Sequence, residues 1–384
     1  MKITVLCFDC SDNAAGRADL LARLLRPEYD VEVVGPCFNG EIWAPVSDGP
    51  VKYRTVPGSR YPAFFRSLPA LVRLADGDVL YASKPRPTSY GIGLLARLAR
   101  RRPLLLDIDD WEVGFFRRSD RWGWLGRFLN RANPNGLPWT WLMEWLVGRA
   151  RAITVASRFL EARFGGVLIP HVRDTDEWRP DRYAGESGRA RLGVGAERVV
   201  MFLGTPRSHK GIDDLAQAMR ILARPDVILA VVGCPPESPA GRRLAVLGTG
   251  VRLIPEIPFS EVPLYLAAAD VVAIPQRLGP DTLGQVPAKL FDAMALGRPI
   301  VSTRVSMIPE ILEGCGVLVE PGDPAGLAKG LAWLLDHPAE AAALGHRARE
   351  RCVAHYSYAA ARKLLLPLIE EVLARPSGRA QNPS

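Results

Sequence analysis

The residues best placed to bind an anion lie in the second half of the chain. Residues 279–286 form a polar loop with two glycines, and Pro287 follows as a favourable residue for a first helical turn. The pattern predicts a helix over residues 287–296, with Gly297 at its C-cap and a buried strand at 300–302. Backbone N–H groups of the loop and the positive end of the helix favour an anionic ligand there.

Two cations follow another predicted strand. Arg207 and Lys210 lie after residues 199–203 and before a helix that starts near Ile212. Open α/β sheets bind ligands at the carboxyl ends of their strands, where such loops lie. We predict that both side chains contact the anion. The alternative is a pair of solvated basic residues on a turn.

A run of carboxylates marks the first half. Residues 107–112, Asp-Ile-Asp-Asp-Trp-Glu, follow a predicted strand at 104–107. Four carboxylates at the end of one strand repel one another and favour a cation, a hydroxyl-rich substrate or a proton as partner. An acidic loop that pairs with Arg117 and Arg118 is the alternative.

Short β-branched runs alternate with helical patterns, which predicts parallel sheets with crossover helices and two Rossmann-like domains. A helix is expected over residues 17–25, and residues 170–180 with the polar stretch 182–197 have the composition of an interdomain linker. The predicted strands are residues 3–8, 31–34, 79–81, 104–107, 152–155, 167–169, 199–203, 228–232, 251–254, 271–274 and 300–302.

Length and composition agree with this organisation. The chain has 384 residues, which is long for one core, and no run approaches the ~20 apolar residues of a membrane span. Its N-terminus lacks a signal-peptide pattern, so we expect a cytoplasmic protein. We expect the six scattered cysteines to be reduced thiols, with a metal or redox role for Cys7 and Cys10 as the lesser alternative.

Ordered motifs in the second half resemble family 4 of the GT-B glycosyltransferases, the glycosyl transferases group 1. The resemblance covers nearly all of the second half and is thin in the first. It implies an α/β protein with two Rossmann-like domains, residues 1–172 and 173–356, that face each other across a cleft. A C-terminal helix at about 357–376 is expected to cross back to the first domain, before a flexible tail at 377–384. The matching segments are residues 169–174, 202–204, 209–211, 231–233, 269–271, 289–299 and 357–359.

The resemblance implies transfer of a sugar from a nucleotide-diphosphate sugar to an acceptor hydroxyl, with retention of configuration and without a metal or other cofactor. Lys210 and Arg207 are expected to stabilise the departing diphosphate, because fixed cations lower the energy of a leaving group that gains negative charge. Family analogy also assigns donor contacts to a set of loop positions: Gly16, Gly204, Gly233, Glu256 and Ile257.

The chain departs from the family pattern at several positions. Thr205 replaces a common arginine, while Gly284 and Asp292 stand where the family often has two glutamates. Members with the Pro-x-Lys-Leu-Phe pattern are more similar to this chain, so Lys289, Asp281 and the loop N–H groups are expected to hold the sugar and phosphates. Asp292 is expected to accept hydrogen bonds from hydroxyls, or else to be an exposed first-turn acid.

In the first half, Asp109 stands where the family often has histidine and Asp110 where it has aspartate. The expected catalytic set is therefore Asp109, Asp110, Lys210 and Asp292. Asp107 and Asp109 also resemble the metal-binding carboxylates of the unrelated GT-A enzymes, which leaves a metal-dependent transferase as an alternative. A non-catalytic sugar-nucleotide-binding or scaffold protein and a nucleotide-sugar isomerase are further alternatives.

The chain has a net charge of +8, and many of its arginines cluster in one region, which indicates a possible binding partner. Arginines alternate with tryptophans between residues 97 and 145, a pattern that favours anionic lipid headgroups. We predict peripheral contact with a membrane surface and a lipid-linked acceptor; the alternative is tryptophans that fill the core beside solvated arginines. No nucleic-acid-binding motif accompanies the charge. The central residues of this region are Arg117, Arg118, Arg121, Trp122 and Trp124.

Overall fold

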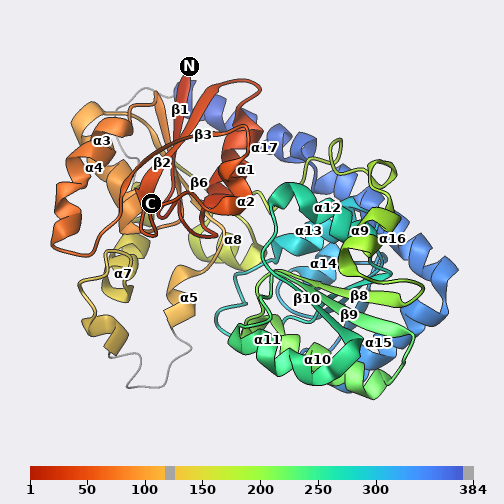
Figure 1. Cartoon of the computed structure of the whole chain (residues 1–384). Coiled ribbons are helices and arrows are strands. Elements are labelled where there is room, and N and C mark those ends of the chain that lie inside the picture. Colours follow the sequence, from red (N-terminus) through yellow and green to blue (C-terminus); the bar gives the residue numbers. More distant parts are fainter. Residues whose placement is uncertain (117–125, 375–384) are drawn as a thin grey trace. The chain divides into compact units, whose positions relative to one another are not determined.

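The structure of the protein is a computed structural model that describes residues 1–116 and 126–374. The chain divides into two compact units (Figure 1). Unit 1 comprises Met1–Pro170 with the chain from Ala361 onward, and unit 2 comprises His171–Ala360.

Unit 1 is built on a parallel seven-stranded sheet in the order β3-β2-β1-β4-β5-β6-β7. The central strands are buried on both faces, which explains their nearly continuous apolar sequence. After β1 the chain adds β2 and β3 on one side of it, and then β4 to β7 on the other side. The reversal point of this parallel sheet therefore lies between β1 and β4, where Ile3 lies opposite Val79. The strands are β1 (Lys2–Leu6), β2 (Asp30–Cys37), β3 (Lys52–Pro57), β4 (Val79–Ser83), β5 (Leu104–Ile108), β6 (Ala152–Val155) and β7 (Val167–Leu168).

Helices connect these strands and cover the sheet. In α1, nine of eleven residues are buried, so this helix lies almost wholly inside the unit. The last helix, α17, enters unit 1 at Ala361 and buries Leu365, Ile369 and Val372 there. The helices are α1 (Ala15–Leu25), α2 (Ala44–Ser47), α3 (Leu68–Leu74), α4 (Ile92–Arg100), α5 (Glu112–Phe116), α7 (Leu137–Trp145), α8 (Arg158–Phe164) and α17 (Tyr358–Ala374).

Unit 2 contains a parallel six-stranded sheet in the order β10-β9-β8-β11-β12-β13. The chain adds β9 and β10 on one side of β8, and β11 to β13 on the other side. The loops that follow the neighbouring strands β8 and β11 therefore lead away in opposite directions at the carboxyl edge of the sheet. The strands are β8 (Arg198–Leu203), β9 (Val227–Val232), β10 (Val251–Ile254), β11 (Val271–Ile274), β12 (Ile300–Thr303) and β13 (Val317–Val319).

One apolar core joins this sheet to its helices, with Phe202, Leu229 and Leu331 fully buried. The helix predicted over residues 287–296 is confirmed as α13, one residue shorter at each end. Pro287 lies at its N-cap rather than in its first turn, and Gly297 follows in the left-handed conformation. The helices of unit 2 are α9 (Gly185–Leu192), α10 (Ile212–Leu222), α11 (Pro239–Leu244), α12 (Val262–Ala267), α13 (Ala288–Ala295), α14 (Ile308–Ile311), α15 (Pro324–Asp336) and α16 (Pro338–His355).

All eleven predicted strands are confirmed, with ends that shift by one to three residues. Two strands were not predicted: β3 is a half-exposed edge strand and β13 has only three half-buried residues. The linker prediction for residues 182–197 is wrong. This segment forms α9, and Gly188 lies so close to α12 that a Cβ there would meet the Leu264 carbonyl oxygen at 2.1 Å.

Candidate functional site

The carboxyl edge of the unit 2 sheet brings most of the predicted anion-binding residues into neighbouring loops. The loop after β8 carries Arg207 and Lys210, and the loop after β11 leads through Asp281 to Lys289 on α13. Because β8 and β11 are paired neighbours, the two loops start side by side at the reversal point of the sheet. This is the place where open parallel sheets bind ligands.

Glycines allow the backbone to pack closely at this edge. Gly204 and Gly233 follow β8 and β9 with φ of 98° and 95°, and a Cβ on Gly233 would lie 3.0 Å from the carbonyl carbon of Gly204. Gly211, at the start of α10, has φ of 70°, and a Cβ there would lie 1.7 Å from the Pro275 oxygen. Backbone atoms leave little room for a Cβ at Gly233 and none at Gly211, while at Gly204 only the positive φ disfavours a larger residue.

Lys210 and Lys289 supply the two side-chain amines of the site. Lys210 Nζ donates to the Thr205 carbonyl at 3.0 Å. Lys289 Nζ is buried 3.7 Å from the centre of the Phe202 ring and has no hydrogen-bond acceptor among the described residues. Burial, and secondly the charge of Lys210, lowers the pKa of Lys289 well below its usual value. Arg207 is exposed on the same loop as Lys210.

Asp281 is buried and faces His209 rather than solvent. Its Oδ2 lies 3.4 Å from His209 Nδ1, which links the loop after β11 to the loop after β8. Thr282 fixes the same loop, because its hydroxyl donates to the Arg277 carbonyl at 2.8 Å and accepts from the Gly279 N–H at 2.9 Å. The structure thus gives Asp281 a positioning contact, and Gly284 is buried in the same loop.

Asp292 is buried on α13 and forms an ion pair with Arg173 through Oδ1 and Nε. Burial raises the pKa of Asp292, while the Arg173 charge opposes that rise. The expectation of an exposed first-turn acid is therefore wrong, because the side chain is 4% exposed. Any hydrogen bond from a hydroxyl has to share this carboxylate with Arg173.

The remaining predicted donor residues belong to other segments of the chain than the loops that carry the two lysines. Glu256 and Ile257 follow β10 in unit 2, where Glu256 is exposed and Ile257 is half-buried. Gly16 lies in unit 1, in the first turn of α1, where a Cβ would lie 3.3 Å from the Trp43 ring. None of these three makes a side-chain contact that identifies a ligand.

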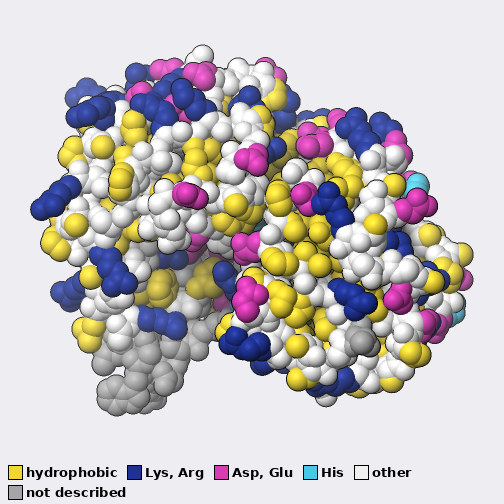
Figure 2. Space-filling model, viewed as in Figure 1, with side chains coloured by type: hydrophobic (Ala, Val, Ile, Leu, Met, Phe, Trp, Pro, Cys, Tyr) yellow, Lys and Arg dark blue, Asp and Glu magenta, His cyan; other side chains and the backbone are white. Residues whose placement is uncertain are grey.

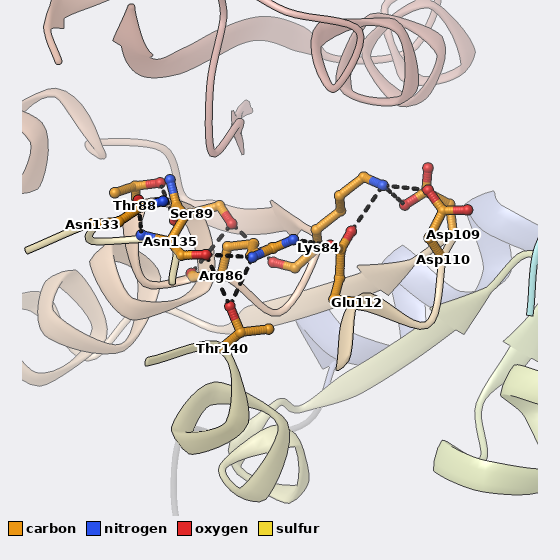
Figure 3. A network of polar contacts seen from close by, with 10 residues as sticks. All are labelled: Lys84, Arg86, Thr88, Ser89, Asp109, Asp110, Glu112, Asn133, Asn135 and Thr140. Carbon is orange, nitrogen blue, oxygen red and sulfur yellow. Dashed lines mark hydrogen bonds and ion pairs between the residues drawn. The ribbon is translucent and has the colours of Figure 1, made fainter. Parts of the chain in front are cut away.

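In unit 1 the acidic cluster surrounds a buried lysine (Figure 3). Lys84 follows β4 with φ of 72°, an unfavourable conformation for a residue with a side chain. Its Nζ lies 3.0 Å from Asp109, 2.6 Å from Asp110 and 2.9 Å from Glu112. Burial lowers the pKa of Lys84, but the three carboxylates raise it well above its usual value, so the ammonium stays charged.

This arrangement decides between the alternatives for the carboxylates. Asp109, Asp110 and Glu112 each bring an oxygen within 4.8 Å of the others, a spacing that suits a metal ion. The Lys84 ammonium, however, lies within 3.0 Å of all three, so the residues present do not fit a divalent cation as well. The predicted pairing with Arg117 and Arg118 lies outside the described residues, as do Arg121, Trp122 and Trp124.

Asp109 is the least stabilised anion of the cluster. Burial raises its pKa to about 7, with further contributions from the neighbouring charges of Asp110 and Asp107 against the opposing charge of Lys84. A carboxyl group with this pKa exchanges its proton near neutral pH, which suits a general acid or base. By contrast, Lys84 and Arg86 hold the pKa of buried Glu112 below its usual value despite burial.

Arg86 extends the network to α7 (Figure 3). Its guanidinium binds Glu112 and donates to the Asn135 carbonyl at 2.6 Å and the Thr140 hydroxyl at 2.7 Å. Thr88 donates to the Phe8 carbonyl at 2.6 Å, which ties the loop after β1 to the same network. The loops after β1, β4 and β5 are therefore joined through buried polar contacts.

Asp107 has a structural partner of its own. Arg17 binds both of its oxygens, at 2.9 and 2.8 Å, and both side chains are almost fully buried. Thr154 donates to the same carboxylate at 2.7 Å, and Arg17 also donates to the carbonyls of Ile169 and Pro170. The alternative of a metal ion held by Asp107 and Asp109 is therefore not favoured, since Asp107 is saturated by these donors.

Comparison with known proteins shows similarity to glycosyltransferases. Residues 197–337 match the family of glycosyl transferases group 1. The GDP-mannose-dependent alpha-(1-6)-phosphatidylinositol monomannoside mannosyltransferase of Mycolicibacterium smegmatis is 34% identical over 216 residues, which cover 51% of this chain and 56% of that protein. The chain thus matches about half the length of this relative.

Two solved structures share the fold of nearly the whole chain. Sucrose-phosphate synthase from Thermosynechococcus elongatus superposes with a TM-score of 0.73 and 20% identity, covering 97% of this chain and 99% of that one. Anabaena Alr3699/HepE in complex with UDP-glucose gives 0.75 and 18%, covering 97% and 100%. The protein has the GT-B glycosyltransferase fold, and the predicted resemblance to group 1 enzymes is confirmed for its second unit.

Several residues of both sites were not predicted from the sequence. Lys84, Arg86, Arg17 and Arg173 supply the partners of every buried carboxylate discussed above except Asp281. A signal existed for Lys84 and Arg86, because they directly follow a predicted strand, as Lys210 does. Arg173 follows the predicted strand at 167–169 and lies in the family-like segment 169–174, but nothing in the sequence points to Asp292 as its partner. Arg17 carries no such signal, since a single arginine beside an apolar stretch is common on protein surfaces.

The six cysteines, all within the described residues, are free and buried, as expected for reduced thiols. Among the helices of residues 1–116 and 126–374, none has both the length and the apolar character that crossing a membrane requires.

Proposed function

We propose that this protein is a glycosyltransferase that uses a nucleotide-diphosphate sugar as donor and binds its diphosphate in unit 2. The observation that carries the proposal is the pair of lysines at the reversal point of the sheet, Lys210 on the loop after β8 and Lys289 in the first turn of α13. The amines of both lysines and the N-terminus of α13 form a site that suits a diphosphate. The relative from Mycolicibacterium smegmatis is named as GDP-mannose-dependent, and Alr3699/HepE was solved with UDP-glucose, so both nucleotides are candidates.

In this mechanism Lys210 and Lys289 stabilise the charge that builds up on the leaving diphosphate. Arg207 and the loop with Asp281 and Gly284 contribute to donor binding, and Gly204 and Gly233 let the backbone approach it. Asp292, held by Arg173, orients α13 and offers its carboxylate to a donor hydroxyl. We assign base contacts to the backbone near Glu256 and Ile257 by family analogy.

Unit 1 supplies the acceptor chemistry in this proposal. Asp109 exchanges a proton with the acceptor hydroxyl near neutral pH, and Asp110 holds the same group by hydrogen bonding. Gly16 resembles the family's first glycine-bearing loop, and we assign it to donor binding by family analogy. By family analogy, transfer is expected to retain configuration. It is expected to need no metal, because side chains supply positive charge near the diphosphate.

The test is release of nucleoside diphosphate from GDP-mannose and UDP-glucose, each with and without EDTA, in the presence of a lipid extract as acceptor source. The proposal predicts release that EDTA does not abolish, that falls at least tenfold in Lys210→Met, and that persists in Lys329→Met, which removes an exposed lysine on α15. NMR of the product then gives its anomeric configuration. Binding of donor with no release would instead identify a non-catalytic sugar-nucleotide-binding protein.

We further propose that unit 1 contacts an anionic membrane surface that presents a lipid-linked acceptor. Trp141 and Trp145 on α7 are 61% and 78% exposed, and Leu98 on α4 is 81% exposed. Figure 2 shows Lys and Arg side chains among hydrophobic ones along the edge of unit 1 where α3 and α4 lie. Exposed indole rings and basic side chains on the same unit match the interfacial region of a bilayer with negative headgroups.

Liposome sedimentation tests this surface. Vesicles with phosphatidylglycerol should sediment the protein, vesicles of phosphatidylcholine should not, and Trp141→Ser with Trp145→Ser should release it. Replacement of Arg117, Arg118 and Arg121 by serine should release it as well. Trp333→Ser on α15, which removes a half-exposed indole from unit 2, is the matched control. Binding that is independent of lipid charge and of these changes would refute the proposed surface.

A further inference from the structure

Lys289 holds a buried amine that lacks a hydrogen-bond acceptor. Part of its side chain is accessible, but Nζ itself is buried against the face of Phe202, 3.7 Å from the ring centre. No oxygen of residues 1–116 or 126–374 accepts a hydrogen bond from it. The face of Phe202 attracts an ammonium ion, but it replaces at most one hydrogen bond of the three N–H donors. Leaving the other donors unsatisfied in a buried site is unfavourable, whereas a neutral amine has a much smaller desolvation penalty.

The charged groups around α13 do not compensate for this burial. Lys210, on the loop after β8, repels a second positive charge. Asp292 attracts one, but its Oδ1 is bound by Arg173. The other titratable groups nearby are engaged elsewhere: His209 with Asp281, Arg349 with the Ala295 carbonyl, and Cys352 with the Phe291 carbonyl at 3.9 Å.

We propose that Lys289 is a neutral amine in the unliganded protein and takes up one proton when the diphosphate of a nucleotide binds beside it. The inference rests on the proposed donor site. Solvent or buffer supplies the proton to the Nζ lone pair, and the resulting ammonium pairs with a phosphate oxygen; no other bond forms or breaks. The direction of the pKa shift at Lys289 agrees with this assignment.

Proton uptake makes nucleotide binding depend on pH in a defined direction. The bound state holds one more proton than the free state, so affinity falls as the pH rises above the pKa of free Lys289. Lys289 differs in this respect from Lys210, whose Nζ donates to the Thr205 carbonyl at 3.0 Å. Lys289 supplies a positive charge only with the ligand present.

Isothermal titration calorimetry with GDP and with UDP tests this directly. Titrations at pH 8, where the terminal phosphates are ionised, are performed in PIPES, HEPES and Tris, which differ in the heat of buffer ionisation. The proposal predicts a binding enthalpy that changes linearly with that heat, with a slope of about one proton taken up. Lys289→Met should lose the slope, and Lys329→Met should keep it.

The outcomes separate this inference from the proposed function. Binding with zero slope in the wild-type protein overturns the inference alone, and it requires no variant that has to fold. A slope that survives in Lys289→Met also overturns it, because another group then takes up the proton. Absence of binding by both nucleotides would overturn the proposed donor site and the inference together.

Discussion

Asp109 gives the most quantitative prediction, the replacement Asp109→Asn. In the folded protein this carboxyl has a pKa of about 7, against the usual value of 3.8. The folded state therefore holds the Asp109 proton more tightly than the unfolded state does. The contribution of Asp109 to stability is largest below pH 4 and is lost as the pH rises towards 7.

The size of the effect follows from this shift. Each pKa unit corresponds to about 1.4 kcal/mol, so three units correspond to about 4 kcal/mol, of which about 3 kcal/mol falls between pH 5 and pH 8. Asparagine cannot ionise and keeps the shape of the side chain. From pH 5 to pH 8, the free energy of unfolding of Asp109→Asn minus that of the wild type should therefore increase by about 3 kcal/mol.

Urea denaturation at pH 5, 6, 7 and 8 measures this difference, with intrinsic tryptophan fluorescence as probe. Asp48→Asn provides the matched control, since Asp48 is exposed and its removal should leave the pH dependence parallel to that of the wild type. Parallel curves for Asp109→Asn and the wild type would refute the raised pKa and, with it, the assignment of Asp109 as the proton-exchanging group.

Three further changes test the buried contacts. Lys84→Met leaves three carboxylates without their central cation and should lower the free energy of unfolding at pH 8 by about 3–5 kcal/mol in urea titrations; a loss below about 1 kcal/mol would contradict the network. Gly211→Ala forces a Cβ against Pro275 and should lower the thermal midpoint and abolish nucleotide-induced stabilisation, and normal nucleotide binding would argue against the loop geometry. Asp292→Ala leaves Arg173 buried and unpaired and should destabilise the protein by about 3–5 kcal/mol, whereas a stability within about 1 kcal/mol of the wild type would mean that the pair is not structural.

The sheets were predictable because their central strands are buried on both faces and read as continuous apolar runs. Edge and short strands lack that pattern: β3 has no buried residue and no regular alternation, and β13 is too short to show a period. The segment that forms α9 was mistaken for a linker because it is rich in glycine and charge. Its glycines instead permit close packing on α12, which the sequence does not reveal.

For the candidate site, the sequence indicates which residues lie there but not which residues they pair with. Lys210 and Lys289 were predicted because they lie between a strand and a helix or at a helix start, where parallel sheets place ligands. Arg173 and Asp292 are 119 residues apart, and no periodicity links them. The carboxylates after β5 were correctly recognised as needing a partner. That partner is Lys84, which comes from the neighbouring strand β4 and could be assigned only once the strand order was known.

The most direct test of the central claim, a nucleotide-sugar site on unit 2, is a thermal unfolding screen. GDP-mannose and UDP-glucose are added with and without Mg²⁺ to the wild type, Lys210→Ala and Lys329→Met. A ligand at 100 times its dissociation constant stabilises a protein by ~2.7 kcal/mol, which shifts the midpoint measurably. The account predicts metal-independent stabilisation by one donor that is lost in Lys210→Ala and kept in Lys329→Met. Stabilisation by neither donor, or equal stabilisation of wild type and Lys210→Ala, would contradict it.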